Sequence, residues 1–486
     1  MRVTLAATAF AAALSACQTL PAGTDVYSGF TLIDPASERR VENAWIAVDK
    51  GKLVRIGKGR ASRTADPARA YDLGGRFVLP GFIDAHAHIT LTGMLKIEVK
   101  DGAVSISQGS DDAITRGNAR IALARGVTTV RNPGGDPEAN ARYDAKIASG
   151  EWIGPEAKHA GAVIQPPPFA GSSFAYPRSA TEWDAEAKRE ADLGMAYFKL
   201  YVSLTEEEIA AGVRAAKAHG LTPIAHLDGV SWARAVDLGV EQFEHALPTS
   251  PDLLEPAARA TFLAEKRQDS TFMYRWFELA DYDGPLIRAL VGKLAEKKIA
   301  VDLTLIVNEI IYNVDIVDAK PPRYDADDPE SLVPPMEISD VEALYPPGSA
   351  ELFTAQLKRS SAGWTAEDFR RARAVTPNVL AFAKLLHDAG VPMMIGTDGG
   401  GGRHYARELL LHQRAGIPEW DVLRMATSEA ADIMGLGHRI GRIAEGYEAD
   451  LVILESDPLA DIDAASQVYG VLNNGALVLS DDLRGK

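Results

Sequence analysis

Val78-Leu-Pro-Gly-Phe-Ile-Asp-Ala-His-Ala-His88 is an apolar run that closes with two histidines two residues apart. The apolar residues predict a buried β-strand at 82–84. Because residues i and i+2 of a strand point to the same face, His86 and His88 are expected to project together. Two neutral imidazoles on one face can chelate a divalent transition metal. The simpler interpretation is a pair of surface histidines after a core strand.

Four more side chains with metal-binding or acid–base chemistry lie in or at the ends of other apolar runs. Lys199 lies within such a run, and an unpaired buried ammonium is costly, so it must lose its charge, pair with an anion or be modified. His226 and His245 each close an apolar run, and Asp398 closes a third, before four glycines. Each residue alone has a structural explanation: a snorkelling lysine, a core histidine or a turn aspartate. Together with the His-x-His pair they favour a metal centre.

The middle of the chain, residues 81–435, alternates strand-like and helical runs, which is the pattern of βα units around a parallel sheet. A helix is expected at 206–219, because Thr205 and Glu208 make a capping-box pattern and Gly220 supplies a stop. Eight strand-like runs predict an α/β fold, a TIM-like (β/α)8 barrel whose C-terminal rim carries the candidate residues. These runs are residues 82–84, 128–131, 157–160, 197–201, 222–226, 242–245, 300–303 and 393–398.

Both ends of the chain have a different pattern. Residues 24–80 consist of short strand-like runs with turn signals, and residues 436–486 repeat that signature. The simplest arrangement is one small β-sandwich domain built from both ends, with the barrel inserted between them. Inside the barrel region, residues 307–362 are rich in proline, aspartate and tyrosine. So long a loop after a barrel strand favours an active-site lid, with a disordered excursion as the alternative.

The composition is that of a soluble globular protein, with 46% hydrophobic and 24% charged residues among 486. A formal net charge of −16, from 51 basic and 67 acidic side chains, argues against a nucleic-acid partner. The same charge would repel anionic lipid headgroups. The single cysteine, Cys17, excludes an intrachain disulfide.

The position of Cys17 suggests processing of the N-terminus. Residues 1–16 carry Arg2 and an apolar run too short to span a membrane, and they end just before the cysteine. Leu14-Ser-Ala-Cys17 resembles the lipobox of bacterial lipoproteins, in which the signal is cut before the cysteine and the cysteine is acylated. The resemblance implies a signal peptide at 1–16, a tether at 17–23 and a lipid anchor in the cell envelope, and Gln18 fits an outer-membrane destination facing the periplasm. The alternative is an ordinary secretory signal that contains a cysteine.

The order of the candidate residues resembles the amidohydrolase superfamily: His-x-His after strand one, then Lys199, His226, His245 and Asp398 after strands four, five, six and eight. Supporting stretches are Gly126-Val-Thr-Thr-Val-Arg131, Ala426-Thr-Ser-Glu-Ala-Ala431 and Gly441-Arg-Ile-Ala-Glu-Gly-Tyr-Glu-Ala-Asp-Leu-Val452. Within the superfamily, the sequence is similar to the imidazolonepropionase- and prolidase-like branch. That branch includes enzymes that cleave dipeptides and N-acyl amino acids.

The resemblance implies two metal ions. It assigns six ligands: His86, His88 and Asp398 for one ion, His226 and His245 for the other, and Lys199 as a bridge. Lys199 would be carboxylated on its nitrogen, since two cations about 3.5–4 Å apart need an anionic bridge. Zinc is the metal expected for this ligand set, although manganese and cobalt suit the same donors.

The implied reaction is hydrolysis of a C–N bond, in an amide, peptide or cyclic amide of a small molecule or short peptide. The metals would lower the pKa of a bridging water to yield hydroxide near neutral pH. Asp398 would take the proton from this water and deliver it to the leaving nitrogen. An alternative is a lactonase, esterase or phosphotriesterase that uses the same metal site. A non-catalytic binding lipoprotein is disfavoured, because every expected ligand is present.

The loops that would shape a substrate pocket depart from the resemblance. Residues 160–169 lack the Gly-Gly-His segment that prolidase-like members often carry after the third strand, and Asn132 stands where relatives often have aspartate. Arg131, Tyr201 and His404 are candidate substrate contacts, with packing, ion pairing or a surface position as the alternative. The sequence leaves the substrate open and is compatible with a homo-oligomer.

Overall fold

The computed structural model describes residues 20–21, 23–62, 66–100, 103–265, 267, 269–315, 358–402 and 404–484, apart from the side chains of 93–95. The signal predicted at 1–16, Cys17 and most of the 17–23 tether lie outside these residues. Among the helices of the described residues, none combines the length and the apolar character needed to cross a bilayer.

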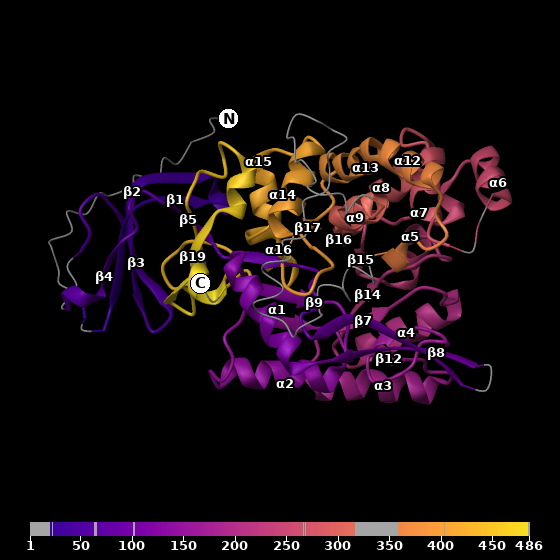
Figure 1. Ribbon diagram of the computed structural model, residues 1–486, viewed down its shortest axis with the longest axis horizontal. Helices are drawn as coiled ribbons and strands as arrows, with labels where there is room; N and C mark the ends of the chain where they lie inside the picture. Colours follow the sequence, from indigo (N-terminus) through magenta and orange to yellow (C-terminus); the bar gives the residue numbers. More distant parts are fainter. Residues whose placement is uncertain are drawn as a thin grey trace, which may run out of the picture.

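Strands from both ends of the chain share one sheet (Figure 1). Its order is β20-β19-β18-β5-β1-β2-β3, with β4 paired to β1. The strands are β1 (Asp25–Asp34), β2 (Arg39–Asp49), β3 (Lys52–Lys58), β4 (Ala70–Asp72), β5 (Phe77–Pro80), β18 (Leu451–Leu454), β19 (Val468–Asn473) and β20 (Ala476–Leu479). β5 lies between β1 and β18, so the C-terminal strands are joined to the N-terminal ones through β5.

Two parallel sheets make up the centre of the molecule. One contains β6 (Phe82–Asp84), β9 (Val127–Asn132) and β10 (Glu156–His159). The other runs β12-β11-β13-β14-β15-β16-β17, which are Phe174–Ala175, Val163–Ile164, Tyr197–Leu200, Thr222–Ala225, Gln242–Glu244, Ala300–Asp302 and Met393–Met394. Each of the eight runs predicted from the sequence overlaps one of these strands, so the parallel α/β architecture is confirmed. The short β11 and β12 are additional.

Backbone contacts connect the two parallel sheets at both edges. The Ala196 amide donates to the His159 carbonyl at 2.7 Å, and Ala160 forms a parallel bridge with Tyr197. At the other edge, the Ala85 amide donates to the Ile395 carbonyl, also at 2.7 Å.

Helices alternate with the parallel strands and cover them. α4 (Glu206–Ala218) confirms the helix predicted from the capping box, because the Thr205 hydroxyl and the Glu208 carboxylate accept each other's backbone amides. Its apolar residues Ile209, Val213 and Ala216 pack in the same core as Phe198 and Leu200 of β13. This packing leaves the alternate residue, Lys199, for the inner side of the sheet.

The start predicted for the lid-like insertion, residue 307, falls inside a helix. α9 (Leu305–Asn313) starts two residues after β16, and most of its side chains are buried. Thr304 is a residue type that often caps a helix, but its side chain makes no capping hydrogen bond here. Instead, the carboxylate of Glu408 accepts the amides of Leu305 and Ile306 at 2.8 and 2.7 Å. Residues 316–357 of the expected lid lie outside the described residues.

A two-stranded antiparallel ribbon follows the His-x-His segment. It consists of β7 (Leu91–Lys100) and β8 (Ala103–Ser110), and it precedes α1 (Asp112–Ala124). Figure 1 shows the ribbon extending to the lower right margin of the molecule. The sequence analysis did not predict these strands.

Candidate active site

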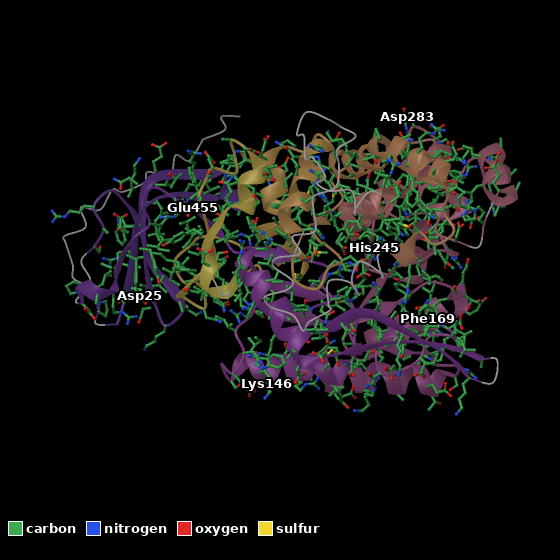
Figure 2. The ribbon with its side chains drawn as sticks, viewed as in Figure 1. Asp25, Lys146, Phe169, His245, Asp283 and Glu455 are labelled. Carbon is green, nitrogen blue, oxygen red and sulfur yellow. The ribbon has the colours of Figure 1, made fainter. Side chains whose placement is uncertain are left out.

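The histidines and the aspartate predicted as ligands meet in one cluster. Asp398 Oδ1 lies 3.3 Å from His86 Nε2 and 3.2 Å from His88 Nε2. The ring of His245 is centred 4.6 Å from that of His86 and 4.4 Å from that of His226. His245 lies within the larger body, away from the sheet that carries Asp25 and Glu455 (Figure 2).

The donor set of this cluster suits a divalent metal. One ligand atom from each of His86, His245 and Asp398 falls within 4.8 Å of the others. His86 Nε2 and His226 Nδ1 are buried and have no hydrogen-bond partner among the described residues. Because buried polar atoms are rarely left without a partner, unpaired imidazole nitrogens beside a carboxylate fit metal ligands.

Three imidazoles are held through their Nδ1 atoms. His86 Nδ1 lies 2.9 Å from Asp302 Oδ1, and His88 Nδ1 lies 2.9 Å from the carbonyl of Gly134. His245 Nδ1 lies 2.8 Å from the Thr304 hydroxyl. An acceptor at Nδ1 keeps the proton there and leaves the Nε2 lone pair for a metal.

Backbone conformation at the cluster is unusual. His245 has a φ of 64°, Asp398 a φ of 54° and Thr304 a φ of 40°. The left-handed region costs a residue with a Cβ about 1–3 kcal/mol and is concentrated at functional sites. The surrounding structure must therefore stabilise these turns against a local cost in conformational free energy.

Arg131 lies beneath the cluster in a buried ion-pair network. Its guanidinium contacts the Asp302 carboxylate, lies 3.3 Å from Glu244 Oε1 and donates to the Ala85 carbonyl at 2.6 Å. None of the three charged side chains has exposed surface. The prediction of Arg131 as a substrate contact therefore does not fit this structure, because all of its donors face internal partners.

Lys199 lies on the inner side of β13, in contact with the Glu244 carboxylate. Burial lowers the pKa of Lys199 to about 7, and the nearby charge of Arg131 acts in the same direction, while Asp302 and Asp398 oppose it. The lowered pKa favours the uncharged form of this amine, while the contact with the Glu244 carboxylate favours the charged form. The uncharged amine is the form that can add to carbon dioxide.

Three other members of the cluster have the charge states that a metal requires, whereas the pKa of His86 is raised, because the carboxylates of Asp302 and Asp398 outweigh the effect of its burial. Burial lowers the pKa of His226 to about 3, with a further contribution from Lys199, and burial also holds the pKa of His245 well below its usual value. Burial alone would raise the pKa of Asp398, but His86 and His88 outweigh it and hold the pKa well below the usual range. At neutral pH, two imidazoles are neutral and the carboxylate is charged.

The two remaining substrate candidates differ in their surroundings. The Tyr201 ring is centred 4.6 Å from the His226 ring, and Lys199 Nζ lies 5.5 Å from the Tyr201 centroid. Tyr201 therefore borders the cluster. His404 is partly exposed and immediately precedes α14 (Tyr405–Arg414). Its role as a substrate contact stays a prediction.

Sequence reasoning missed several residues that support the cluster. Asp302 closes β16, the seventh predicted strand, so an acidic residue at a strand end was the available signal. Gln165 follows β11 and lies beside Tyr201, whose amide donates to the Ile164 carbonyl at 3.1 Å. Gln165 is 4% exposed, and its Oε1 has no partner within the described part of the chain.

Asn132, by contrast, is a buried structural residue whose side chain forms hydrogen bonds with those of Asn140 and His159.

Asp302→Asn is expected to weaken metal binding by about 10–100-fold, because His86 loses the carboxylate that orients it. The free energy of unfolding should fall by about 3 kcal/mol, since Arg131 loses a buried partner. Titration against a chromophoric chelator and chemical denaturation measure the two effects. Asp283→Asn, at a side chain that is 93% exposed, is the matched control and should change neither. Unchanged metal affinity in Asp302→Asn would show that this contact does not orient the imidazole.

Parallel strands ending in a buried histidine–carboxylate cluster define an α/β protein with a candidate metal centre. Residues 77–478 match the Amidohydrolase family, so this chain belongs to the amidohydrolase family. Imidazolonepropionase of Streptomyces avermitilis is 26% identical over 223 residues, which cover 41% of this chain and 52% of that protein. Imidazolonepropionase of Rhizorhabdus wittichii is 25% identical over 285 residues, covering 50% and 70%. The chain thus spans about half the length of the first of these relatives.

The fold is shared with solved structures over nearly the whole chain. A Xaa-Pro dipeptidase with bound methionine superposes with a TM-score of 0.63 at 20% identity, covering 94% of this chain and 100% of the other. The likeness implies an α/β, TIM-like barrel fold. The family match is to amidohydrolases, the class predicted from the order of the candidate residues.

Proposed function

We propose that this chain is a metal-dependent amidohydrolase that cleaves an amide, peptide or cyclic amide bond. The observation that carries the proposal is the buried cluster itself. Imidazoles from the ends of three strands and the Asp398 carboxylate converge beside Lys199 in a member of this family. Relatives named imidazolonepropionase and Xaa-Pro dipeptidase support a small molecule or short peptide as substrate, such as a dipeptide or an N-acyl amino acid.

The architecture that we propose around the site is a closed (β/α)8 barrel at 81–435. The backbone contacts between the two parallel sheets at both edges support this closure. Residues 24–80 and 436–486 would form the small β-sandwich domain, which the sheet shared by both ends supports.

The proposed cofactor is a pair of zinc ions, with manganese or cobalt as alternatives. His86, His88 and Asp398 would hold one ion, and His226 and His245 the other, with carboxylated Lys199 between them. When bound, the ions supply Lewis acidity and lower the pKa of water. The inner position of Lys199 and its lowered pKa support the carbamate bridge.

Asp398 carries the proton in the proposed reaction. Its carboxylate is charged at neutral pH, so it can accept a proton from the attacking water and donate it to the leaving nitrogen. Tyr201 borders the cluster and would contact the substrate through its ring and hydroxyl. Gln165, whose buried Oε1 has no partner among the described residues, is a further candidate. We also propose that Cys17 carries the lipid anchor that holds the enzyme at the outer membrane, facing the periplasm. The lipobox resemblance supports this placement.

The test is hydrolysis by soluble protein that begins after Cys17, supplied with zinc and bicarbonate. A panel of dipeptides and N-acyl amino acids is assayed beside lactones, aryl esters and phosphotriesters. Turnover of amides that is lost on chelation and regained with metal is the expected result. Turnover confined to lactones or esters would retain the metal site and reject the amide assignment. Binding without any turnover would support the non-catalytic alternative.

A further inference from the structure

The β7–β8 ribbon exposes apolar side chains to an unusual degree. Among the described residues, six large apolar side chains are exposed, and three of them belong to this ribbon: Ile97 at 54%, Val99 at 69% and Val104 at 48%. Ile97 is paired with Ile106, and Val99 with Val104, so these side chains share one face. An exposed apolar face on a protruding ribbon marks an interaction site.

The two edges of the ribbon differ. On the β8 side, the Ile106 amide donates to the Pro168 carbonyl at 2.9 Å, and the Ile106 carbonyl accepts from the Ala170 amide at 2.9 Å. On the β7 side, the described residues provide no strand other than β8 to pair with it. The unpaired backbone N–H and C=O groups of a long edge strand are a template for pairing with another chain.

The direction of the backbone groups on β7 follows from this arrangement. Ile106 uses its amide and carbonyl on the side away from β7, so Ile97 opposite it is a non-hydrogen-bonded pair within the ribbon. In an antiparallel ladder, such a residue points its own N–H and C=O to the other side. The N–H and C=O of Ile97 therefore face the outer edge of β7.

We propose that the outer edge of β7 pairs, antiparallel, with the same edge of a second copy of this chain, about a two-fold axis at Ile97. Ile97 then exchanges both backbone hydrogen bonds with the partner's Ile97. Lys96 lies opposite the partner's Glu98, and Glu98 lies opposite the partner's Lys96. This inference does not depend on the proposed function.

Charge and packing favour a second copy as the occupant. Within one chain, Lys96 Nζ already lies 2.5 Å from Glu98 Oε1. The order Lys96, Ile97, Glu98 is also self-complementary when the strand is reversed about its centre, so the pairing adds an opposite charge of the partner beside each member of this ion pair. Ile97 gains an apolar neighbour on its open side, between Ile106 and the partner's Ile97. Two ribbons also become a four-stranded sheet, and three or more strands are more stable than an isolated pair. A register centred on Val99 instead would extend past the end of β7 at Lys100.

The test is the dimer dissociation constant of the purified full chain, measured by sedimentation equilibrium. Glu98→Lys places like charges opposite each other and should raise Kd by about 10-fold or more. The double variant with Lys96→Glu and Glu98→Lys restores the opposite-charge pairs and should return Kd to the wild-type value. Glu296→Lys, at an exposed position near the end of α8 (Pro285–Lys297), makes the same charge change elsewhere and should leave Kd unchanged.

A second variant tests the backbone pairing. Ile97→Pro removes the outward N–H without breaking a hydrogen bond inside the ribbon, and proline is tolerated on edge strands. It should give a monomer with unchanged metal content. A wild-type chain that is monomeric at all concentrations would overturn the proposal. So would a dimer that Glu98→Lys and Ile97→Pro leave intact, or a double swap that associates no better than Glu98→Lys alone.

Discussion

Asp398→Asn is expected to lower kcat/KM for an amide substrate by about 10⁴-fold, the upper end of what a positioned acid–base group contributes. The substitution is close to isosteric, so the contacts near His86 and His88 can persist. An amide side chain, however, cannot accept the proton from water or return it to the leaving nitrogen. Asn also tolerates the left-handed backbone at this position, where φ is 54°. The loss should therefore appear mainly in kcat.

Steady-state kinetics at matched metal occupancy measure this effect. Metal content is determined in the same samples, because a weakened ligand and a missing proton carrier both lower activity. Asp283→Asn, at the outer surface (Figure 2), is the control and should retain wild-type kcat/KM. If Asp398→Asn keeps its metal and loses only a few-fold in kcat, the proton carrier is another residue.

Lys199→Ala is expected to reduce the metal content from two ions per chain to one or none, and to lower kcat/KM by about 10³-fold. The substitution removes the nitrogen that would carry the bridging carbamate. Elemental analysis of protein prepared with zinc and bicarbonate gives the stoichiometry. Added acetate should restore part of the activity, because a small carboxylate can occupy the space left by the side chain and replace the bridge.

Lys199→Met provides a control for packing, since it keeps most of the apolar stem without the nitrogen. It should lose metal as Lys199→Ala does but retain more stability, because it leaves a smaller cavity. One ion per chain in the wild type, unchanged in both variants, would reject the two-metal assignment.

Most of the fold could be predicted because its strands are continuous apolar runs. Parallel strands covered on both faces need such runs, and all eight predicted runs overlap strands. α9 was missed because its N-terminus is capped by Glu408, a residue about 100 positions further along the chain. The sequence of the β7–β8 ribbon did contain a strand signal, since Ile97 and Val99 alternate with charged residues. It was not used, because the expected alternation of strands and helices does not include a two-stranded ribbon between a strand and the next helix.

The residues expected to bind a metal directly could be predicted from the sequence, but the residues that hold them in place could not. Position at the end of a strand is visible in a sequence, and it identified the histidines and Asp398. The contact between Asp302 and His86 joins residues 216 positions apart, so only the closure of the sheets creates it. For the same reason, the sequence left open whether Arg131 contacts a substrate or forms ion pairs, and the structure shows ion pairs with Glu244 and Asp302 from two distant strands. The left-handed backbone at His245 and Asp398 could not be predicted, because neither position is a glycine.

The junction between β5 and β6 links the site to the order in which the chain is synthesised. Gly81 alone separates the two strands, and its amide donates to the Asp450 carbonyl at 2.8 Å, next to the pairing of Pro80 with Leu451. A Cβ at Gly81 would lie 2.0 Å from the Thr128 hydroxyl, so this junction accepts no other residue without displacement. A nascent chain that has not yet reached residue 451 therefore has one edge of β5 without its partner. β6, which leads to His86 and His88, pairs with β9, but β5 and Gly81 directly before it gain their full set of backbone partners only when translation is almost complete. The segment that leads into the candidate site is therefore anchored late in synthesis.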